Sequence, residues 1–242
     1  MSTVAVVAHR GASGEFPENT AAAFREAIRL EVEVIELDVH LTRDEHLLVI
    51  HDGTVDRNSN GSGRVADLAM DEVRQLDAGS WKEARFAGEP YLEFGQALDL
   101  MPPAMRLNVH VKAYDEDRDR VVPMVVGELQ QRELLSTAFV ASDAPSLEVA
   151  RAVEPELEIC NLSTQPSEDY VARSQALGCR ILQPGNGMTD AAMVSEAHAL
   201  GMEVNPFYAD DEDEMRRLIE CGVDGILTNH PARLQALLRQ SQ

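Results

Sequence analysis

Short apolar runs rich in β-branched residues alternate with amphipathic stretches along the whole chain. In the stretches, apolar residues recur at positions i, i+3 and i+4, as in helices that bury one face, most clearly over 20–30, 211–222 and 231–240. Eight strands alternating with helices predict an α/β protein whose parallel βα units close into one (β/α)8 TIM barrel. A doubly wound open sheet is the alternative, although no Gly-rich dinucleotide fingerprint follows the first run. The runs occupy residues 4–9, 32–39, 105–112, 137–142, 157–162, 179–184, 202–207 and 224–229.

One interval, between the second and third runs, breaks this alternation. About sixty-five residues separate Asp38 from the third run, far more than one crossover needs. The interval opens with an expected hairpin, in which the polar turn 43–46 leads back along the second strand, and a helix is expected near 70–76. Insertions at the carboxyl ends of barrel strands usually cover the active site. We therefore expect a single domain over residues 1–242 with a small insertion after the second strand, at approximately 45–100.

Two carboxylates lie in the second run. Glu36 and Asp38 are two residues apart in a β-branched strand, so their side chains point to the same face. Adjacent anions repel each other unless a cation lies between them, and a hard divalent cation such as Mg²⁺ or Ca²⁺ would satisfy both. This pair therefore predicts a metal site. The alternative is a structural network in which the pair bonds to Arg10 or Lys112, and such networks perturb pKa values in a similar way.

Two histidines and an arginine lie at the ends of neighbouring segments. His9 and His51 belong to the residue type that titrates near neutral pH, which makes them candidates for an acid and a base beside the metal. Arg10 offers a planar fork of donors suited to phosphate; the alternative is an arginine that bridges the barrel wall to a loop carboxylate. His40 shares the parity of Asp38 but lies further along, facing an exposed hairpin. We expect His40 to pack at the rim rather than bind a metal.

Polar residues alternate with apolar ones in the third run. Asn108, His110 and Lys112 share one face of this strand. Three polar side chains that point inward together are costly to desolvate without a bound partner. His110 is therefore a candidate metal ligand and Lys112 a candidate phosphate ligand, whereas a lone inward histidine is more often a satisfied core residue. Asn108 fits a purely structural hydrogen-bonding role equally well.

Composition and charge narrow the range of partners. The chain has 242 residues, and 42 acidic against 21 basic side chains give a net charge of −21. Nucleic-acid binding and docking on an anionic membrane both need clustered Lys and Arg, so we expect neither partner. No run reaches the ~18 apolar residues of a membrane span, and no basic start precedes the first run, which indicates a cytoplasmic protein without stable membrane association. The three cysteines lack metal-type spacing and are expected to be buried and unpaired.

Several segments resemble, in the same order, the motifs of the glycerophosphodiester phosphodiesterase family, whose fold is a (β/α)8 barrel. The resemblance covers nearly the whole chain. It implies metal-dependent hydrolysis of a small-molecule glycerophosphodiester to glycerol 3-phosphate and an alcohol, with histidine acid–base catalysis. The segments are HRGASGEFPENT (9–20), IELDVHLTRD (35–44), VIHD (49–52), DGTVDRNSNGSGRVADL (52–68) and GVDGILTNHP (222–231).

The resemblance also implies roles for individual residues, with three departures. His110 stands where the family has a glutamate as its third metal ligand. Mg²⁺ or Ca²⁺ would be the family's cation, but a neutral imidazole favours Mn²⁺, Co²⁺ or Zn²⁺. Asn229 replaces the usual aspartate, and Phe207 and Tyr208 replace a Trp-Thr pair, which affects alcohol specificity more than the chemistry. The implied roles are cation binding for Glu36 and Asp38, acid–base catalysis for His9 and His51, phosphate binding for Arg10 and Lys112, and lining of the glycerol pocket for Phe207.

Two other functions fit the same barrel. A lysophospholipase D or sphingomyelinase D type of phosphodiesterase would need an apolar channel or a membrane-facing surface, and the composition indicates neither. A non-catalytic barrel that only binds a ligand is the second alternative, with His110 as its main support. The remaining candidate side chains argue against it, because a decayed site has no physical reason to keep all of them.

Overall fold

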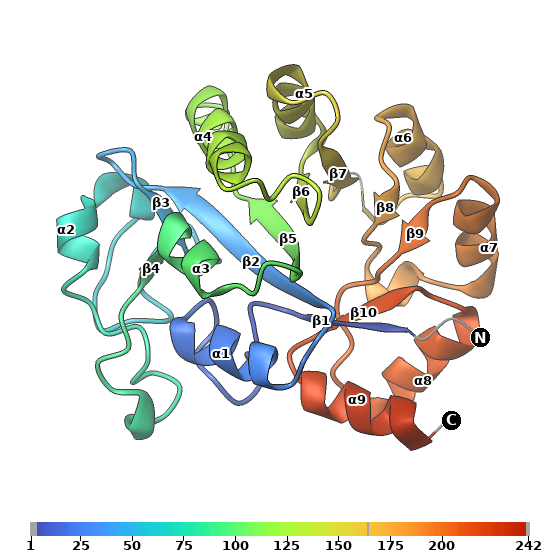
Figure 1. Cartoon of the computed structure of the whole chain (residues 1–242), viewed down its shortest axis with the longest axis horizontal. Helices are drawn as coiled ribbons and strands as arrows, with labels where there is room; N and C mark the ends of the chain where they lie inside the picture. Colours follow the sequence, from blue (N-terminus) through green and yellow to red (C-terminus); the bar gives the residue numbers. More distant parts are fainter. Residues whose placement is uncertain (1–3, 164, 241–242) are drawn as a thin grey trace.

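A ring of parallel strands surrounded by helices forms the body of the molecule (Figure 1). The computed structural model describes residues 4–163 and 165–240. Within these residues the strands of the ring follow the order β10-β1-β2-β5-β6-β7-β8-β9, each parallel to the next. The ring strands are β1 (Ala5–Ala8), β2 (Val34–Leu41), β5 (Arg106–Val111), β6 (Ala138–Ser142), β7 (Glu158–Asn161), β8 (Ile181–Leu182), β9 (Glu203–Val204) and β10 (Gly225–Thr228).

Backbone hydrogen bonds between the segments of β9 and β10 close the ring. The Asp224 N–H donates to the Val204 carbonyl oxygen over 3.0 Å, and the Leu227 N–H donates to the Pro206 carbonyl oxygen over 3.1 Å. On its other side, β10 pairs in parallel with β1. The predicted (β/α)8 TIM barrel is therefore confirmed, and the doubly wound open sheet is wrong.

Helices cover the outside of the ring because each buries an apolar stripe against it. In the helix predicted over 20–30, the Thr20 side chain accepts the Ala23 N–H at the amino end, and Phe24 and Ala27 are buried. The helices predicted over 211–222 and 231–240 are present as well. The outer helices are α1 (Ala21–Arg29), α3 (Phe94–Leu100), α4 (Arg118–Gln131), α5 (Ala144–Val153), α6 (Tyr170–Ala176), α7 (Ala191–Ala199), α8 (Glu212–Cys221) and α9 (Pro231–Gln240).

The insertion after β2 begins with the predicted hairpin. β3 (Leu47–Val49) pairs antiparallel with β2, and β4 (Leu92–Glu93) pairs with β3. Helix α2 (Met70–Val73) is shorter than the predicted 70–76, and two short 3-10 turns, Val65–Asp67 and Ala84–Phe86, complete the segment. The insertion has an apolar cluster of its own, which we name the insertion cluster: Leu48, Ile50, Val55, Val65, Met70, Val73, Ala78 and Tyr91.

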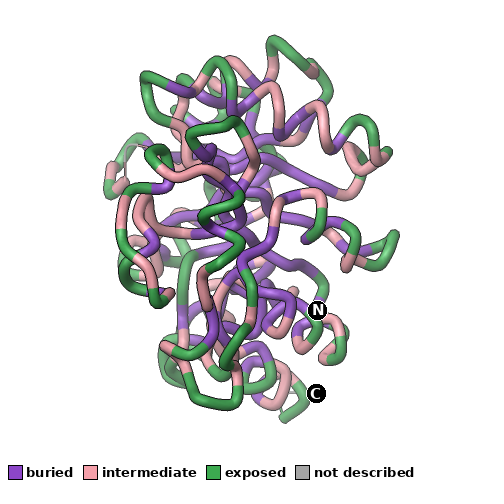
Figure 2. The backbone as a smooth tube through the Cα atoms, turned by 90° about the vertical axis from the view of Figure 1, so that its left-hand side faces the viewer, coloured by how far each residue is buried: buried purple, intermediate pink, exposed green. Residues whose placement is uncertain are grey.

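Burial follows the strands through the middle of the molecule, whereas exposed residues gather at the outer turns (Figure 2). β8 and β9 are much shorter than the predicted runs 179–184 and 202–207. Pro184 and Pro206 lie in these runs and lack the N–H that extends a strand ladder. The cysteines are unpaired as expected, although Cys221 is only partly buried. No helix within 4–163 and 165–240 is long and apolar enough to cross a membrane.

A glycine determines how α8 ends. Gly222 has a φ of 84°, in the left-handed region that costs other residues about 1–2 kcal/mol. We expect Gly222→Ala to lower the free energy of unfolding by about 1 kcal/mol, measured by urea denaturation. Gly127→Ala is the matched control, because Gly127 lies inside α4 with open space around its Cα. This second change should stabilise the protein by roughly 0.5–1 kcal/mol, and equal effects at the two sites would contradict the argument.

Candidate active site

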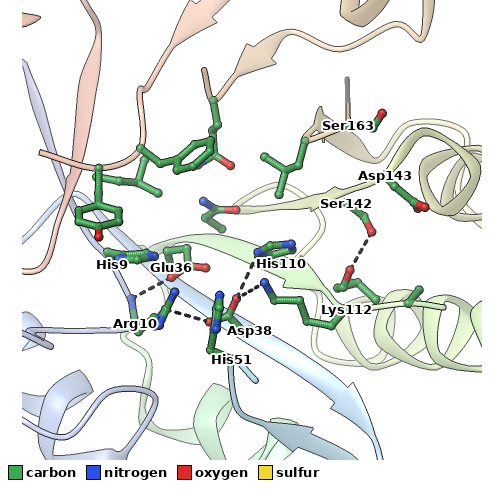
Figure 3. Close-up of a pocket in the computed structure, with 18 of the residues that line it drawn as sticks. His9, Arg10, Glu36, Asp38, His51, His110, Lys112, Ser142, Asp143 and Ser163 are labelled. Atoms are coloured by element: carbon green, nitrogen blue, oxygen red, sulfur yellow. Dashed lines mark hydrogen bonds and ion pairs between the residues drawn. The ribbon is translucent and has the colours of Figure 1, made fainter. Parts of the chain in front are cut away.

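A cleft of about 550 Å³ opens where the carboxyl ends of the ring strands meet. This edge of a barrel carries the active site in enzymes with this fold. The residues to which the sequence analysis assigned catalytic or binding roles all line the cleft, although they come from segments far apart in the chain (Figure 3). These are His9, Arg10, Glu36, Asp38, His51, His110, Lys112 and Phe207.

Glu36, Asp38 and His110 form a compact donor cluster on β2 and β5. Each can offer one ligand atom, and these atoms lie within 4.8 Å of one another. The register of the two strands explains the grouping, because Asp38 is directly opposite His110 and Glu36 is opposite Asn108. Two carboxylates and one imidazole are a donor set that divalent cations accept, so these residues fit a metal ion.

Asp38 is the most heavily contacted member of the cluster. Its Oδ1 atom lies 3.1 Å from His110 Nδ1 and 3.1 Å from Lys112 Nζ, and its Oδ2 atom lies 3.4 Å from Arg10 Nε (Figure 3). The Asn19 side-chain amide also donates to Oδ2 over 2.9 Å. Burial alone would raise the pKa of Asp38, but the positive and donor groups around it hold that pKa well below its ordinary value. The alternative of a structural network is therefore present around the same carboxylates as the candidate metal site.

Glu36 has far less compensation than Asp38. Its Oε2 atom accepts the Arg10 backbone N–H over 2.8 Å. Burial, followed by the negative charge of Asp38, raises the pKa of Glu36 to about 8. A positive charge beside the free oxygen of Glu36 would stabilise its ionised form. The surroundings of Glu36, like the set of donor atoms, therefore indicate a cation site.

The backbone at the end of β1 is shaped to make the contact with Glu36. Arg10 has a φ of 59° and Gly11 a φ of 78°, both in the left-handed region. A non-glycine residue held there is strained, and such strain is concentrated at functional sites. The conformation directs the Arg10 N–H at Glu36 while its side chain reaches Asp38 and Glu18.

His51 is held by a chain of charged groups that reaches into the insertion. Its Nδ1 atom lies 2.7 Å from Asp52 Oδ1. Arg57 donates from Nε to Asp52 over 2.6 Å and from Nη2 to Glu18 over 2.6 Å, and Glu18 also accepts from Arg10. Burial lowers the pKa of His51, and the Arg57 hydrogen bonds hold the pKa of Asp52 well below its ordinary value, so Asp52 stays ionised beside the ring.

His9, in contrast to His51, has a neutral partner. Its Nδ1 atom lies 2.8 Å from the Asn229 side-chain oxygen, and its ring stacks on Tyr208 with centroids 5.3 Å apart. Burial, and then the charge of Arg10, lower the pKa of His9 to about 4. The two cleft histidines therefore sit in different electrostatic surroundings.

His40 was expected to pack beside an exposed hairpin without binding a metal, and the role of Asn108 was left open. His40 is outside the donor cluster, as expected, but it is buried, and its Nε2 atom lies 3.0 Å from the His51 carbonyl oxygen. The Tyr114 ring lies beside the His40 ring, with centroids 6.1 Å apart. Asn108 is buried at the cleft, and its side-chain amide has no hydrogen-bond partner among residues 4–163 and 165–240. This observation does not support the structural alternative for Asn108.

Glu18, Asn19 and Arg57 are site residues that the sequence analysis did not single out. Glu18 and Asn19 belong to the Pro-Glu-Asn-Thr element at 17–20, so the motif itself was their only signal. Arg57 lies in a polar, Gly-rich stretch that reads as a loop. No spacing rule connects it with a carboxylate 39 residues earlier.

Comparisons with known proteins agree on one family. The model of the glycerophosphoryl diester phosphodiesterase family matches residues 9–233. A glycerophosphodiester phosphodiesterase of Caldanaerobacter subterraneus subsp. tengcongensis is 32% identical over 240 residues, which cover 97% of this chain and 98% of the relative. A putative glycerophosphodiester phosphodiesterase of Bacillus subtilis is 31% identical over 232 residues, covering 93% and 94% of the two chains.

Solved structures show the same similarity. A putative glycerophosphoryl diester phosphodiesterase from Silicibacter pomeroyi superposes with a TM-score of 0.92 at 26% identity, covering 99% of this chain and 94% of that one. A phosphodiesterase from Oleispira antarctica, solved in complex with the product sn-glycerol-3-phosphate, gives a TM-score of 0.90 at 29% identity, covering 97% and 96%. Sequence and fold thus point to the same group of enzymes.

Proposed function

This chain belongs to the glycerophosphoryl diester phosphodiesterase family, and from this membership we propose that it splits a glycerophosphodiester into glycerol 3-phosphate and an alcohol, using a divalent cation and two histidines. The enzyme is a phosphoric diester hydrolase. The observation that carries the proposal is the cluster of Glu36, Asp38 and His110 donor atoms within 4.8 Å of one another, in a cleft that His9 and His51 also line.

The cation would be held by Glu36, Asp38 and His110. When bound, it supplies stabilisation for the negative charge that develops on the phosphate oxygens and lowers the pKa of a hydroxyl group beside it. Arg10 and Lys112 flank the same carboxylates and orient the phosphate group with their hydrogen-bond donors. Phe207, which is partly exposed at the cleft, contacts the glycerol moiety.

The two histidines transfer the protons of the reaction. One of His9 and His51 accepts the proton of the substrate's own glycerol hydroxyl, which attacks phosphorus to form a cyclic phosphate. The other donates a proton to the oxygen of the leaving alcohol. Water then opens the cyclic phosphate to give glycerol 3-phosphate. The whole chain acts as one domain in this proposal, and the insertion forms one wall of the cleft through His51.

The first experiment is release of glycerol 3-phosphate from glycerophosphocholine and glycerophosphoethanolamine. The protein is treated with a chelator and then supplied with Mg²⁺, Ca²⁺, Mn²⁺, Co²⁺ or Zn²⁺ in separate assays. Turnover that depends on an added metal supports the proposal. Bound metal without turnover would redirect the search to another phosphodiester, and neither metal binding nor turnover would favour the non-catalytic barrel.

A lysophospholipase D type of activity has one observation in its favour. Tyr114, Phe207 and Tyr208 are the exposed aromatic side chains of the cleft, and each is at least 37% exposed. An acyl chain could lie against such a rim. Product analysis with a long-chain lysophosphatidylcholine separates the two activities, because our proposal expects the water-soluble diester to be the better substrate.

His110 is expected to control which metal the site prefers. An imidazole in place of a carboxylate removes one negative charge and adds a nitrogen ligand, which disfavours Mg²⁺ and Ca²⁺ relative to Mn²⁺, Co²⁺ and Zn²⁺. We expect His110→Glu to change the ratio of the Zn²⁺ and Mg²⁺ dissociation constants by about 10-fold or more in favour of Mg²⁺. Substitution of residues that only contact a metal ligand can already change metal affinity by this factor. Calorimetric titration measures both constants. His46→Gln removes an imidazole outside the cleft and serves as the control; an unchanged ratio in His110→Glu would refute the assignment.

A further inference from the structure

The two cleft histidines differ in the chemical nature of the group that holds them. His51 Nδ1 faces the carboxylate of Asp52, whereas His9 Nδ1 faces the side-chain amide of Asn229. A carboxylate can only accept, but an amide can present either its oxygen or its NH₂ group to an imidazole. The orientation of the Asn229 amide therefore decides which nitrogen of His9 carries the proton.

Asp210 determines that orientation. The Asn229 NH₂ group donates to Asp210 Oδ2 over 2.6 Å, and the Asn229 backbone N–H donates to Asp210 Oδ1 over 2.8 Å. The Thr228 hydroxyl adds a further contact of 3.1 Å to the same oxygen. A flipped amide would place its oxygen against the carboxylate oxygen, where two acceptors repel each other. The carbonyl oxygen of Asn229 must therefore face His9, and it accepts the Nδ1–H.

The loop between β9 and α8 also holds the plane of the ring. Tyr208 stacks on His9 with an interplanar angle of 19°, and it lies two residues before Asp210 in the same loop. At the amide oxygen that faces His9, the Ser13 hydroxyl lies 2.7 Å from the Asn229 oxygen and 2.6 Å from the His9 carbonyl oxygen. The position and the tautomer of His9 are thus set by residues at the seam where the barrel closes.

We propose that Asn229 and Asp210 are positioning residues that hold His9 with its proton on Nδ1, so that Nε2 presents a lone pair to the cleft and His9 is the proton acceptor of the reaction. His51 is then the proton donor. The inference rests on the proposed function for its chemistry, but the tautomer it assigns is a property of the protein alone.

The step balances with these roles. The glycerol hydroxyl gives its proton to His9 Nε2 while its oxygen forms a bond to phosphorus. The bond between phosphorus and the leaving oxygen breaks, and that oxygen keeps the electron pair and takes a proton from His51. When water opens the cyclic phosphate, its proton goes to His51, and His9 returns its own proton to the glycerol oxygen. Both histidines end in the state in which they began.

The charged groups that face His9 agree with a neutral ring. They are Arg10 from the same segment, Asp38 from β2 and His51 from the insertion. Burial and Arg10 favour the neutral form and outweigh the opposite effect of Asp38 and of the Asn229 contact. Burial lowers the pKa of His51 as well, and the charge of Asp38 and then the contact with Asp52 oppose that shift. The two rings therefore differ in the group that holds Nδ1, an amide for His9 and a carboxylate for His51.

The tautomer can be read directly by NMR of the ring nitrogens in ¹⁵N-labelled protein, with His9→Gln used to assign the signals. We expect His9 to carry its proton on Nδ1 and to have a bare Nε2 at neutral pH. Asp210→Asn frees the Asn229 amide to flip and should move the proton to Nε2 in part of the molecules. Asp224→Asn is the matched control, since Asp224 holds His198 outside the cleft in a similar way. A proton on Nε2 of wild-type His9, or an unchanged tautomer in Asp210→Asn, would overturn the proposal.

The direction of proton transfer can be tested with two leaving groups. Glycerophosphocholine releases an alkoxide that needs a proton, whereas the p-nitrophenyl ester of glycerol 3-phosphate releases a stable phenolate that does not. His51→Ala should lose about 10²- to 10⁴-fold in kcat on the choline ester and recover most of it on the p-nitrophenyl ester. His9→Ala should be impaired on both. If His9→Ala recovers on the p-nitrophenyl ester and His51→Ala does not, His51 is the proton acceptor and this part of the proposal is wrong.

The positioning residues have their own signature in the same assays. Asp210→Asn and Asn229→Leu should lower kcat by about 10- to 100-fold on both esters, because they misplace the acceptor, with KM little changed. A rise of KM by a similar factor, with kcat unchanged, would instead indicate a role in substrate binding. If wild type cleaves neither ester, the proposed function fails, while the NMR result still decides the positioning. Should Asn229→Leu not fold, Asp210→Asn carries the test, since it preserves the shape of the side chain.

Discussion

Replacement of Asp38 by asparagine is expected to remove nearly all turnover and most of the metal affinity. Asp38 is fully buried, and His110, Lys112 and Arg10 all lie within 3.4 Å of its carboxylate oxygens. A bound cation supplies several kcal/mol of transition-state stabilisation, and each ~1.4 kcal/mol is a factor of ten. We therefore expect kcat/KM to fall by about 10³-fold or more.

The same substitution should cost stability, because it leaves buried positive groups without their counter-charge. Breaking a buried pair in this way typically costs about 3–5 kcal/mol, which urea denaturation would resolve. Glu203→Gln is the control: Glu203 accepts from Arg106 over 2.8 Å in a partly exposed ion pair, away from the cleft. That variant should lose less stability than Asp38→Asn and keep its turnover. Wild-type turnover in Asp38→Asn would rule out both the metal site and the phosphate arrangement proposed here.

His51→Ala is expected to reduce kcat on glycerophosphocholine by about 10²- to 10⁴-fold, the usual contribution of a positioned acid or base. The ring is only partly buried and is held by Asp52 at 2.7 Å rather than by the core. Its removal should therefore leave the fold intact. Turnover and thermal unfolding, measured on the same preparation, separate loss of chemistry from loss of structure.

His46→Ala provides the comparison for this second substitution. His46 also pairs with a carboxylate, Glu93 Oε2 at 2.8 Å, but it lies outside the cleft. Its loss should leave turnover within about two-fold of wild type, as expected for an exposed ion pair. If the two alanine variants have the same activity, His51 has no part in the reaction. Asp52→Asn should fall between them, because it keeps the imidazole but weakens its charged partner.

Features set by local alternation were predictable from the sequence. Glu36 and Asp38 share a face because strand side chains have a period of two, and the same parity brings His110 and Lys112 to the cleft. The alternation of strands and helices was sufficient for the barrel. The motifs that resemble the phosphodiesterase family then identified the family to which the chain belongs.

Features that depend on contacts across the fold were not predictable in this way. Asp210 reaches Asn229 across 19 residues and Arg57 reaches Glu18 across 39, and neither spacing corresponds to any local period. His40 is a further example. Its position on the face of Asp38 was predictable, but its contact with Tyr114, which lies 74 residues later in the chain, was not, because no local pattern connects Tyr114 with the hairpin.

The hydrogen bonds that Arg57 makes to Asp52 and Glu18 have a consequence for how the protein responds to heat. Arg57 is supplied by the insertion, whose apolar cluster is separate from the barrel core, yet it joins Asp52 to Glu18 on the β1–α1 loop. Regions with small cores of their own open at lower free energy than the main core. Loosening of the insertion would release the partner of His51 while the ring of strands is still folded. The temperature at which activity is lost should therefore lie below the temperature at which the barrel unfolds. Substitutions that stabilise the insertion should raise the inactivation temperature and leave the unfolding temperature of the barrel unchanged.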